Sequence, residues 1–137
     1  MKNKSITSDF TENKLSPYSR ESRVALAGMV TRLFEHWELP LEDQLAFLGL
    51  SNRTTLTRYR KGAPLANHRD LLDRVASLFE IHHLLRILYP HNREIVYEWM
   101  TTPNRDFNGR APGDIVREQG FPGLLSVKRY LEHERER

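Results

Sequence analysis

The chain of 137 residues contains no cysteine, which excludes disulfides and thiolate metal sites. It also has no apolar run near the roughly 20 residues that span a bilayer. The first 16 residues are polar and lack the apolar stretch of a signal peptide, so a cytoplasmic location is expected. A chain of this length can bury about two thirds of its unfolded surface and needs no covalent staples to fold.

Residue patterns typical of enzymes and metal sites are missing as well. The six histidines form no His-x-x-x-His pair, and the adjacent His82 and His83 cannot share one face of a helix. Segment 109–114 lacks the Gly-Lys-Ser/Thr ending of a phosphate-binding loop, and no nucleophile elbow is present. We therefore expect no catalytic residue, no cofactor and no metal ligand.

Positive charge is concentrated in one segment of the chain. Between Ser51 and Arg74 there are six cations and two anions, so this segment has a net charge of +4. The net charge of the whole chain is +3. The remaining residues together carry −1. A local excess of this kind indicates a surface that meets the phosphates of nucleic acid.

Apolar residues recur at helical spacing along most of the chain, and no segment alternates as a strand does, which predicts an all-α fold. Residues 1–18 lack this periodicity and are expected to form a flexible arm. The charged tail 132–137 is expected to fray. The predicted helices span about 19–37, 41–48, 52–60, 67–88, 92–101, 112–119 and from 122 onward.

Residues 41–62 have the layout of a helix-turn-helix. A short helix stops at Gly49, Ser51 is expected to cap the next helix, and Leu56 and Tyr59 would point inward. A recognition helix of this kind presents long donors near its N-terminus. The alternative is an ordinary helical pair with solvated charges. The predicted DNA contacts are Asn52, Arg53 and Thr55 at base edges and Arg58, Arg60 and Lys61 at phosphates. Ser51 is also expected to contact DNA.

A second motif lies in the last third of the chain. Residues 99–104 read Trp-Met-Thr-Thr-Pro-Asn, and residues 109–116 read Gly-Arg-Ala-Pro-Gly-Asp-Ile-Val. This pattern resembles the C-terminal toxin-binding region of the Xre/MbcA/ParS antitoxin family. Residues 48–51 and 55–62 are similar to the Xre-type helix-turn-helix that precedes it. Together the two resemblances cover about residues 20–132.

The chain departs from the family pattern at four points. Asn108 stands where a glycine is frequent, Ala111 where Ser or Thr is common, and Tyr59 where Trp is frequent. The charged end at Arg137 differs from the short Gly-ended finish of many relatives. Since Asn tolerates left-handed backbone better than most residues, we expect the turn at Asn108 to survive.

The resemblance implies a flexible arm (1–18), a helix-turn-helix DNA-binding domain (19–90) and a toxin-binding domain (91–137). It implies an antitoxin of a type II toxin–antitoxin system whose C-terminal region covers the active site of a RES- or ParT-type toxin. Such toxins consume NAD or transfer ADP-ribose from it. The antitoxin would also bind operator DNA and repress its own operon. Expected toxin-binding residues are Asn104, Arg105, Asn108, Arg110, Lys128, Arg129, Arg135 and Arg137.

Two other functions stay open at this point. The chain could be a stand-alone transcriptional regulator with a C-terminal dimerisation domain, or an interaction module whose helix-turn-helix is a relic. Whether residues 92–137 bind the product of a neighbouring gene separates the regulator from the antitoxin. If the helix-turn-helix is a relic, replacing Arg53 and Arg58 with Ala would change no DNA affinity. A homodimer is expected, because palindromic half-sites lie about 34–36 Å apart. Helices 19–37 and 67–88 are both candidates for its surface.

Overall fold

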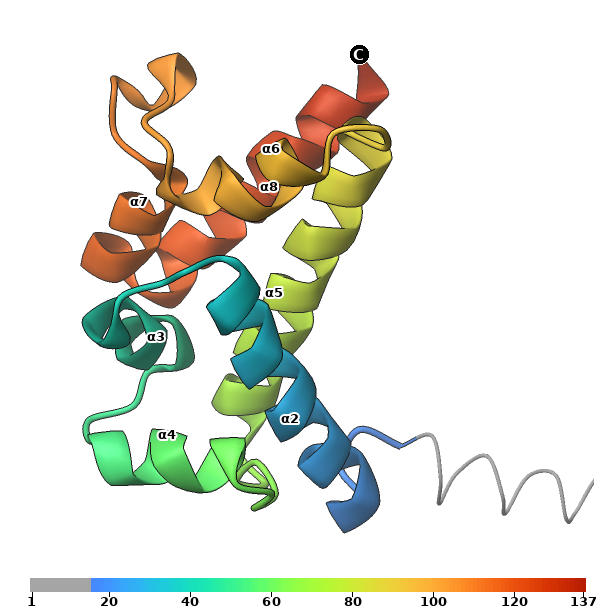
Figure 1. Cartoon of the computed structure of the whole chain (residues 1–137), viewed down its shortest axis with the longest axis vertical. Helices are drawn as coiled ribbons and strands as arrows, with labels where there is room; N and C mark the ends of the chain where they lie inside the picture. The colour runs from blue at the N-terminus through green and yellow to red at the C-terminus, as the bar shows by residue number, and fades with distance from the viewer. Residues whose placement is uncertain (1–15) are drawn as a thin grey trace, which may run out of the picture.

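The computed structural model describes residues 16–137 and consists of helices joined by short loops (Figure 1). This confirms the predicted all-α class. In this part of the chain, the strand-like pairing is one isolated bridge between Asn104 and Arg110. The expected arm, residues 1–18, falls almost wholly outside the described residues. The α-helices are α2 (Arg20–His36), α3 (Leu41–Leu48), α4 (Arg53–Arg60), α5 (Arg69–Leu88), α6 (Arg93–Glu98), α7 (Pro112–Gln119) and α8 (Phe121–Glu136), with 3-10 turns η1 (Trp99–Thr101) and η2 (Arg105–Phe107).

The end of α3 shows how local chemistry sets a helix boundary. Gly49 has a φ of 69°, and the Leu50 amide donates to the Leu45 carbonyl at 2.8 Å, which closes the helix. A Cβ at position 49 would lie 2.9 Å from Cζ of Arg74. The Arg74 guanidinium occupies this space because Nη1 donates to the Ala46 carbonyl at 3.2 Å. The left-handed turn therefore favours glycine, and a Cβ at this position would also displace the end of the Arg74 side chain.

The cap of α4 corrects one prediction. Asn52, not Ser51, is the N-cap, and its Oδ1 accepts hydrogen bonds from the Thr55 amide at 3.0 Å and the Thr55 hydroxyl at 3.2 Å. The helix starts one residue later than a Ser51 cap requires, at Arg53. Ser51 is exposed and lies in the turn before the cap.

The end of the chain corrects a second prediction. The tail does not fray, because α8 continues as far as Glu136. Leu131 is 1% exposed and anchors this part of the helix in the core, and Arg137 Nη1 donates to Glu134 at 3.0 Å. Burial of one apolar side chain in the last turns outweighs the tendency of a charged segment to unwind.

One hydrophobic core runs through both halves of the described chain. It joins Phe34 and Leu48 of the N-terminal half to Met100, Val116 and Leu124 of the C-terminal half. Helix α5 runs along the molecule and packs most extensively on α8, while α7 packs on α3 (Figure 1). The two halves therefore depend on each other for stability.

No helix within residues 16–137 has the length and apolarity that a membrane crossing requires.

Candidate functional site

Helix α4 lies at one end of the molecule (Figure 1), and its buried residues, Leu56 and Tyr59, share one face. Leu56 is fully buried and Tyr59 is 4% exposed, and the Tyr59 hydroxyl accepts a hydrogen bond from the Ala66 amide at 3.2 Å. These contacts leave the opposite face of α4 outward. Of the predicted DNA contacts, Thr55 is partly buried, and the exposed ones are Ser51, Asn52, Arg53, Arg58, Arg60 and Lys61.

The exposed cations near α4 divide into two groups. Arg60 is tied to α3, because its Nη2 donates to Oε1 of Gln44 at 2.7 Å, and Gln44 in turn donates to the Leu39 carbonyl at 2.9 Å. In the part of the chain that the structure describes, no carboxylate lies within the 4.0 Å ion-pair distance of Arg53, Arg58 or Lys61. Those three cations are available to an external anion, whereas Arg60 orients α4 against α3.

The loop after η1 projects from the end of the molecule opposite α4 and is closed by its own backbone (Figure 1). The Asn104 amide donates to the Arg110 carbonyl at 3.0 Å, and the Gly109 amide donates to the Asn104 carbonyl at 2.9 Å. Asn108 has a φ of 60° and Gly109 a φ of 82°. The expectation that Asn108 would keep the left-handed turn is confirmed.

An aromatic cluster attaches this loop to α8. The rings of Phe107 and Tyr130 lie 4.9 Å apart and those of Trp99 and Tyr130 6.1 Å apart. The Tyr130 hydroxyl donates to Oδ2 of Asp106 at 2.5 Å. Burial, helped by this bond, raises the pKa of Tyr130 well above its ordinary value. Phe107 was not among the residues predicted to matter in this loop, although an aromatic residue inside a polar loop is itself an indication of docking.

The structure separates the predicted toxin contacts into free and bound side chains. Arg110 pairs with Glu118, and Lys128 Nζ lies 3.2 Å from Glu80. Arg137 pairs with Glu134, as described above, and Asn104 caps η2 by accepting from the Asp106 amide. The exposed members without an ion pair among residues 16–137 are Arg105, Asn108, Arg129 and Arg135.

A stack of rings joins α2, α5 and α6. Tyr97 stacks on His36 with ring centroids 5.0 Å apart and on His82 with centroids 5.7 Å apart. Burial lowers the pKa of His82, and the positive charges of Arg86, His36 and His83 lower it further. His82 is therefore held neutral in the folded protein at pH values where it would be charged in the unfolded chain.

This stack predicts a loss of stability in mild acid. Because the folded pKa of His82 lies below 6.5, the unfolded state binds more protons, and stability falls as the pH drops below 6.5 toward the folded pKa. We expect His82→Phe to reduce the loss of stability between about pH 7.5 and pH 5.5. The measurement is urea unfolding at several pH values, with His68→Gln, at an exposed position outside the stack, as the control. An unchanged slope in His82→Phe would contradict the assignment.

In residues 16–137, no group of three or more His, Cys, Asp or Glu side chains is placed to hold a metal ion. Unpaired polar side chains gather where the sequence predicted contacts, on the outer face of α4 and on the projecting loop with the neighbouring face of α8. Both present hydrogen-bond donors and cations suited to binding rather than to acid–base chemistry.

Comparison with known proteins agrees with this division. The family described as "Antitoxin Xre-like helix-turn-helix domain" matches residues 18–80, and "Antitoxin Xre/MbcA/ParS C-terminal toxin-binding domain" matches residues 84–137. The chain is also 30% identical over 122 residues to "Uncharacterized protein y4oB" of Sinorhizobium fredii (strain NBRC 101917 / NGR234). The aligned region covers 88% of this chain and 92% of that relative. The two matched domains imply an antitoxin role, with a toxin partner and DNA binding. The chain belongs to the Xre/MbcA/ParS family of antitoxins.

Proposed function

We propose that the chain neutralises a RES- or ParT-type toxin, which consumes NAD or transfers ADP-ribose from it, and represses its own operon. The observation that carries this proposal is the placement of the two candidate surfaces at opposite ends of one core (Figure 1). A toxin on the projecting loop and a DNA duplex on α4 would then not compete for the same space. An operator-bound complex of all three partners is compatible with this arrangement.

On the toxin side, the contact is assigned to the side chains that the fold leaves free. Arg105 lies in the projecting loop, and Arg129 adjoins Tyr130, which packs on the same loop. A guanidinium can form two parallel hydrogen bonds with a carboxylate in the toxin cleft. Arg110 and Lys128 would act indirectly, because their charges are already engaged with Glu118 and Glu80.

The test is rescue of growth when the chain is co-expressed with the product of its adjacent gene. A truncation after Tyr89 is unsuitable, because it removes core residues such as Met100 and Leu124. We expect Arg105→Glu combined with Arg129→Glu to abolish rescue. Two interface arginines worth about 2 kcal/mol each would weaken toxin binding about 100- to 1,000-fold. A control with the same charge change is Arg20→Glu combined with Arg69→Glu, at exposed positions outside the proposed contact.

Three results are informative. A lethal neighbour that the wild type and the control rescue, but the loop variant does not, supports the proposal. Equal rescue by the loop variant would refute the assigned contact. A harmless neighbour that does not bind the chain would refute the antitoxin role and favour a stand-alone regulator.

On the DNA side, Arg53→Ala is expected to weaken operator binding by about 1–3 kcal/mol, as loss of a base contact does. Arg58→Ala should instead lower affinity for all sequences and reduce the salt slope by about 0.9. Gel shifts at several salt concentrations measure both effects. Arg135→Ala, at an exposed position near the end of α8, serves as the control. Operator binding that does not respond to salt would count against the assignment.

Repression is proposed to require a homodimer that reads two half-sites. Met29 on α2 is 45% exposed and lies next to Phe79 of α5 at a shallow hollow of about 240 Å³. An exposed methionine beside a partly buried phenylalanine is a suitable apolar centre for such a contact. The hollow includes residues from both predicted dimerisation helices.

A further inference from the structure

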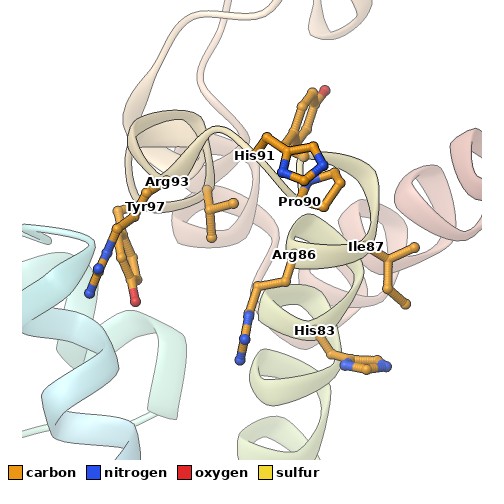
Figure 2. A pocket seen from close by; sticks show the side chains of 9 residues that line it. His83, Arg86, Ile87, Pro90, His91, Arg93 and Tyr97 are labelled. Carbon is orange, nitrogen blue, oxygen red and sulfur yellow. The ribbon is translucent and has the colours of Figure 1, made fainter.

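A groove of about 800 Å³ lies between the C-terminal half of α5 and α6, and none of its lining residues is acidic. Figure 2 shows Arg86 and Arg93 on the two sides of the groove, with both side chains extending in the same direction, while Pro90 and His91 close one end. Neither the loop contact nor the α4 contact uses these residues. The groove is therefore a third candidate surface.

The positive charge of this groove is not compensated within the described residues. No carboxylate lies within 4.0 Å of Arg86 or Arg93, in contrast to Arg110 and Arg117 of the same half, which are both paired. Arg93 packs over the ring of Tyr97, with its Cζ 5.6 Å from the ring centroid, which holds the guanidinium at the rim. The groove thus presents two unpaired cations to an anionic partner, and one of them, Arg93, is held in place by Tyr97.

The lining resembles a protein interface in composition. Arginine and tyrosine are enriched at such interfaces, and lysine and acidic residues are depleted. Here the lining includes Arg86, Arg93 and Tyr97 and no lysine, aspartate or glutamate. Ile87 is 42% exposed at the edge and offers an apolar anchor point. An acidic segment that also carries an apolar side chain would match both features.

The position of the groove indicates which partner binds there. Its lining residues, apart from His83, fall within residues 84–137, the region matched by the toxin-binding domain. Helix α5 begins at Arg69, next after α4 in the chain. Arg86 lies 17 residues further along α5, a distance of about 25 Å from that end of the helix. A duplex on α4 would therefore not reach the groove. A second copy of the chain is disfavoured, because a two-fold contact here would bring like charges together.

We propose that this groove binds an acidic segment of the toxin, as a contact additional to the projecting loop. Carboxylates of that segment would pair with Arg86 and Arg93, and an apolar side chain would lie against Ile87. This inference rests on the proposed antitoxin function and extends its contact to a surface on α5 and α6.

The experiment measures the affinity of the full chain for the purified product of the adjacent gene. We expect Arg86→Glu combined with Arg93→Glu to weaken binding about 100-fold, because both charge pairs with the toxin are lost. The wild-type affinity should fall with salt, and the variant affinity should fall less. The control with the same charge change is again Arg20→Glu with Arg69→Glu. For the variant with Arg86→Glu and Arg93→Glu, operator binding and thermal unfolding should be the same as for the wild type, which would show that this variant folds.

The outcomes distinguish the inference from the function on which it rests. Unchanged toxin affinity in the groove variant, with loss in the Arg105→Glu/Arg129→Glu variant, overturns the groove and leaves the antitoxin role intact. No toxin binding by the wild type overturns both. If the groove variant keeps its affinity for the toxin but loses affinity for operator DNA, the groove is a DNA contact. Binding of inorganic pyrophosphate that the toxin does not displace would make it a small-anion site. Arg86→Gln with Arg93→Gln replaces the groove variant if that variant does not fold.

Discussion

Replacing Gly123 with valine is expected to destabilise the whole chain by about 3 kcal/mol or more, a large part of a typical stability of about 5–15 kcal/mol. A Cβ at this position would lie 2.6 Å from the carbonyl oxygen of Ile115 and 2.9 Å from Cβ of Gln119. The first of these atoms belongs to the backbone of α7 and cannot move without shifting that helix. Gly123 is thus the position where α8 crosses closely over the end of α7.

Urea unfolding measures this effect, and operator binding adds a second readout. Because one core includes both halves, a change in α8 should also lower the fraction of chain that binds DNA. The matched control is Gly28→Ala on α2, where the nearest atom to a Cβ is Arg32 Nη1 at 3.5 Å. This change should stabilise the helix by about 0.5–1 kcal/mol. If the valine variant unfolds like the wild type, the close crossing of α7 and α8 is wrong.

Replacing Arg117 with leucine is expected to cost about 2–3 kcal/mol, less than the 3–5 typical of fully buried pairs because Arg117 is partly exposed. Nη1 of Arg117 lies 3.0 Å from Oδ1 of Asp43, whose side chain is only 7% exposed. The same arginine bonds Asp114 at 2.9 Å, and these two hydrogen bonds raise its pKa. Its loss would leave the Asp43 carboxylate buried without its partner in α7.

A double-mutant cycle tests this explanation. Adding Asp43→Asn to Arg117→Leu should recover part of the lost stability, because a neutral amide is less costly to bury than an unpaired carboxylate. The control is Arg69→Leu, whose pair with Asp73 is 3.9 Å long and involves an arginine side chain that is 85% exposed. Such surface pairs contribute about 0–1 kcal/mol. Strictly additive effects in the cycle would contradict a coupling between the two helices.

The bounds of the short helices were predictable from the sequence. The expected helices 41–48 and 112–119 coincide with α3 and α7. Each follows a signal that acts within a few residues: proline at or just before the start, and glycine just after the end. The left-handed Asn108 was predictable for the same reason, since backbone preference is a property of the residue itself.

The role of each cation was not predictable in this way. Arg105 and Arg110 lie in one loop, yet Arg105 is exposed and unpaired among the described residues, whereas Arg110 is paired with Glu118. The partner of Lys128 is Glu80, which is 48 positions away in the chain. An ion pair depends on which helices meet, and periodicity carries no information about that.

The sequence by itself determined the helices, the family and the place of the basic segment, because these depend on spacing and on short motifs. Only the tertiary structure decided that both halves share one core, that Arg117 joins α7 to Asp43 of α3, and that Arg86 and Arg93 flank one groove. These three features arise from contacts between residues far apart in the chain. Such contacts are selected by the packing of whole helices against one another.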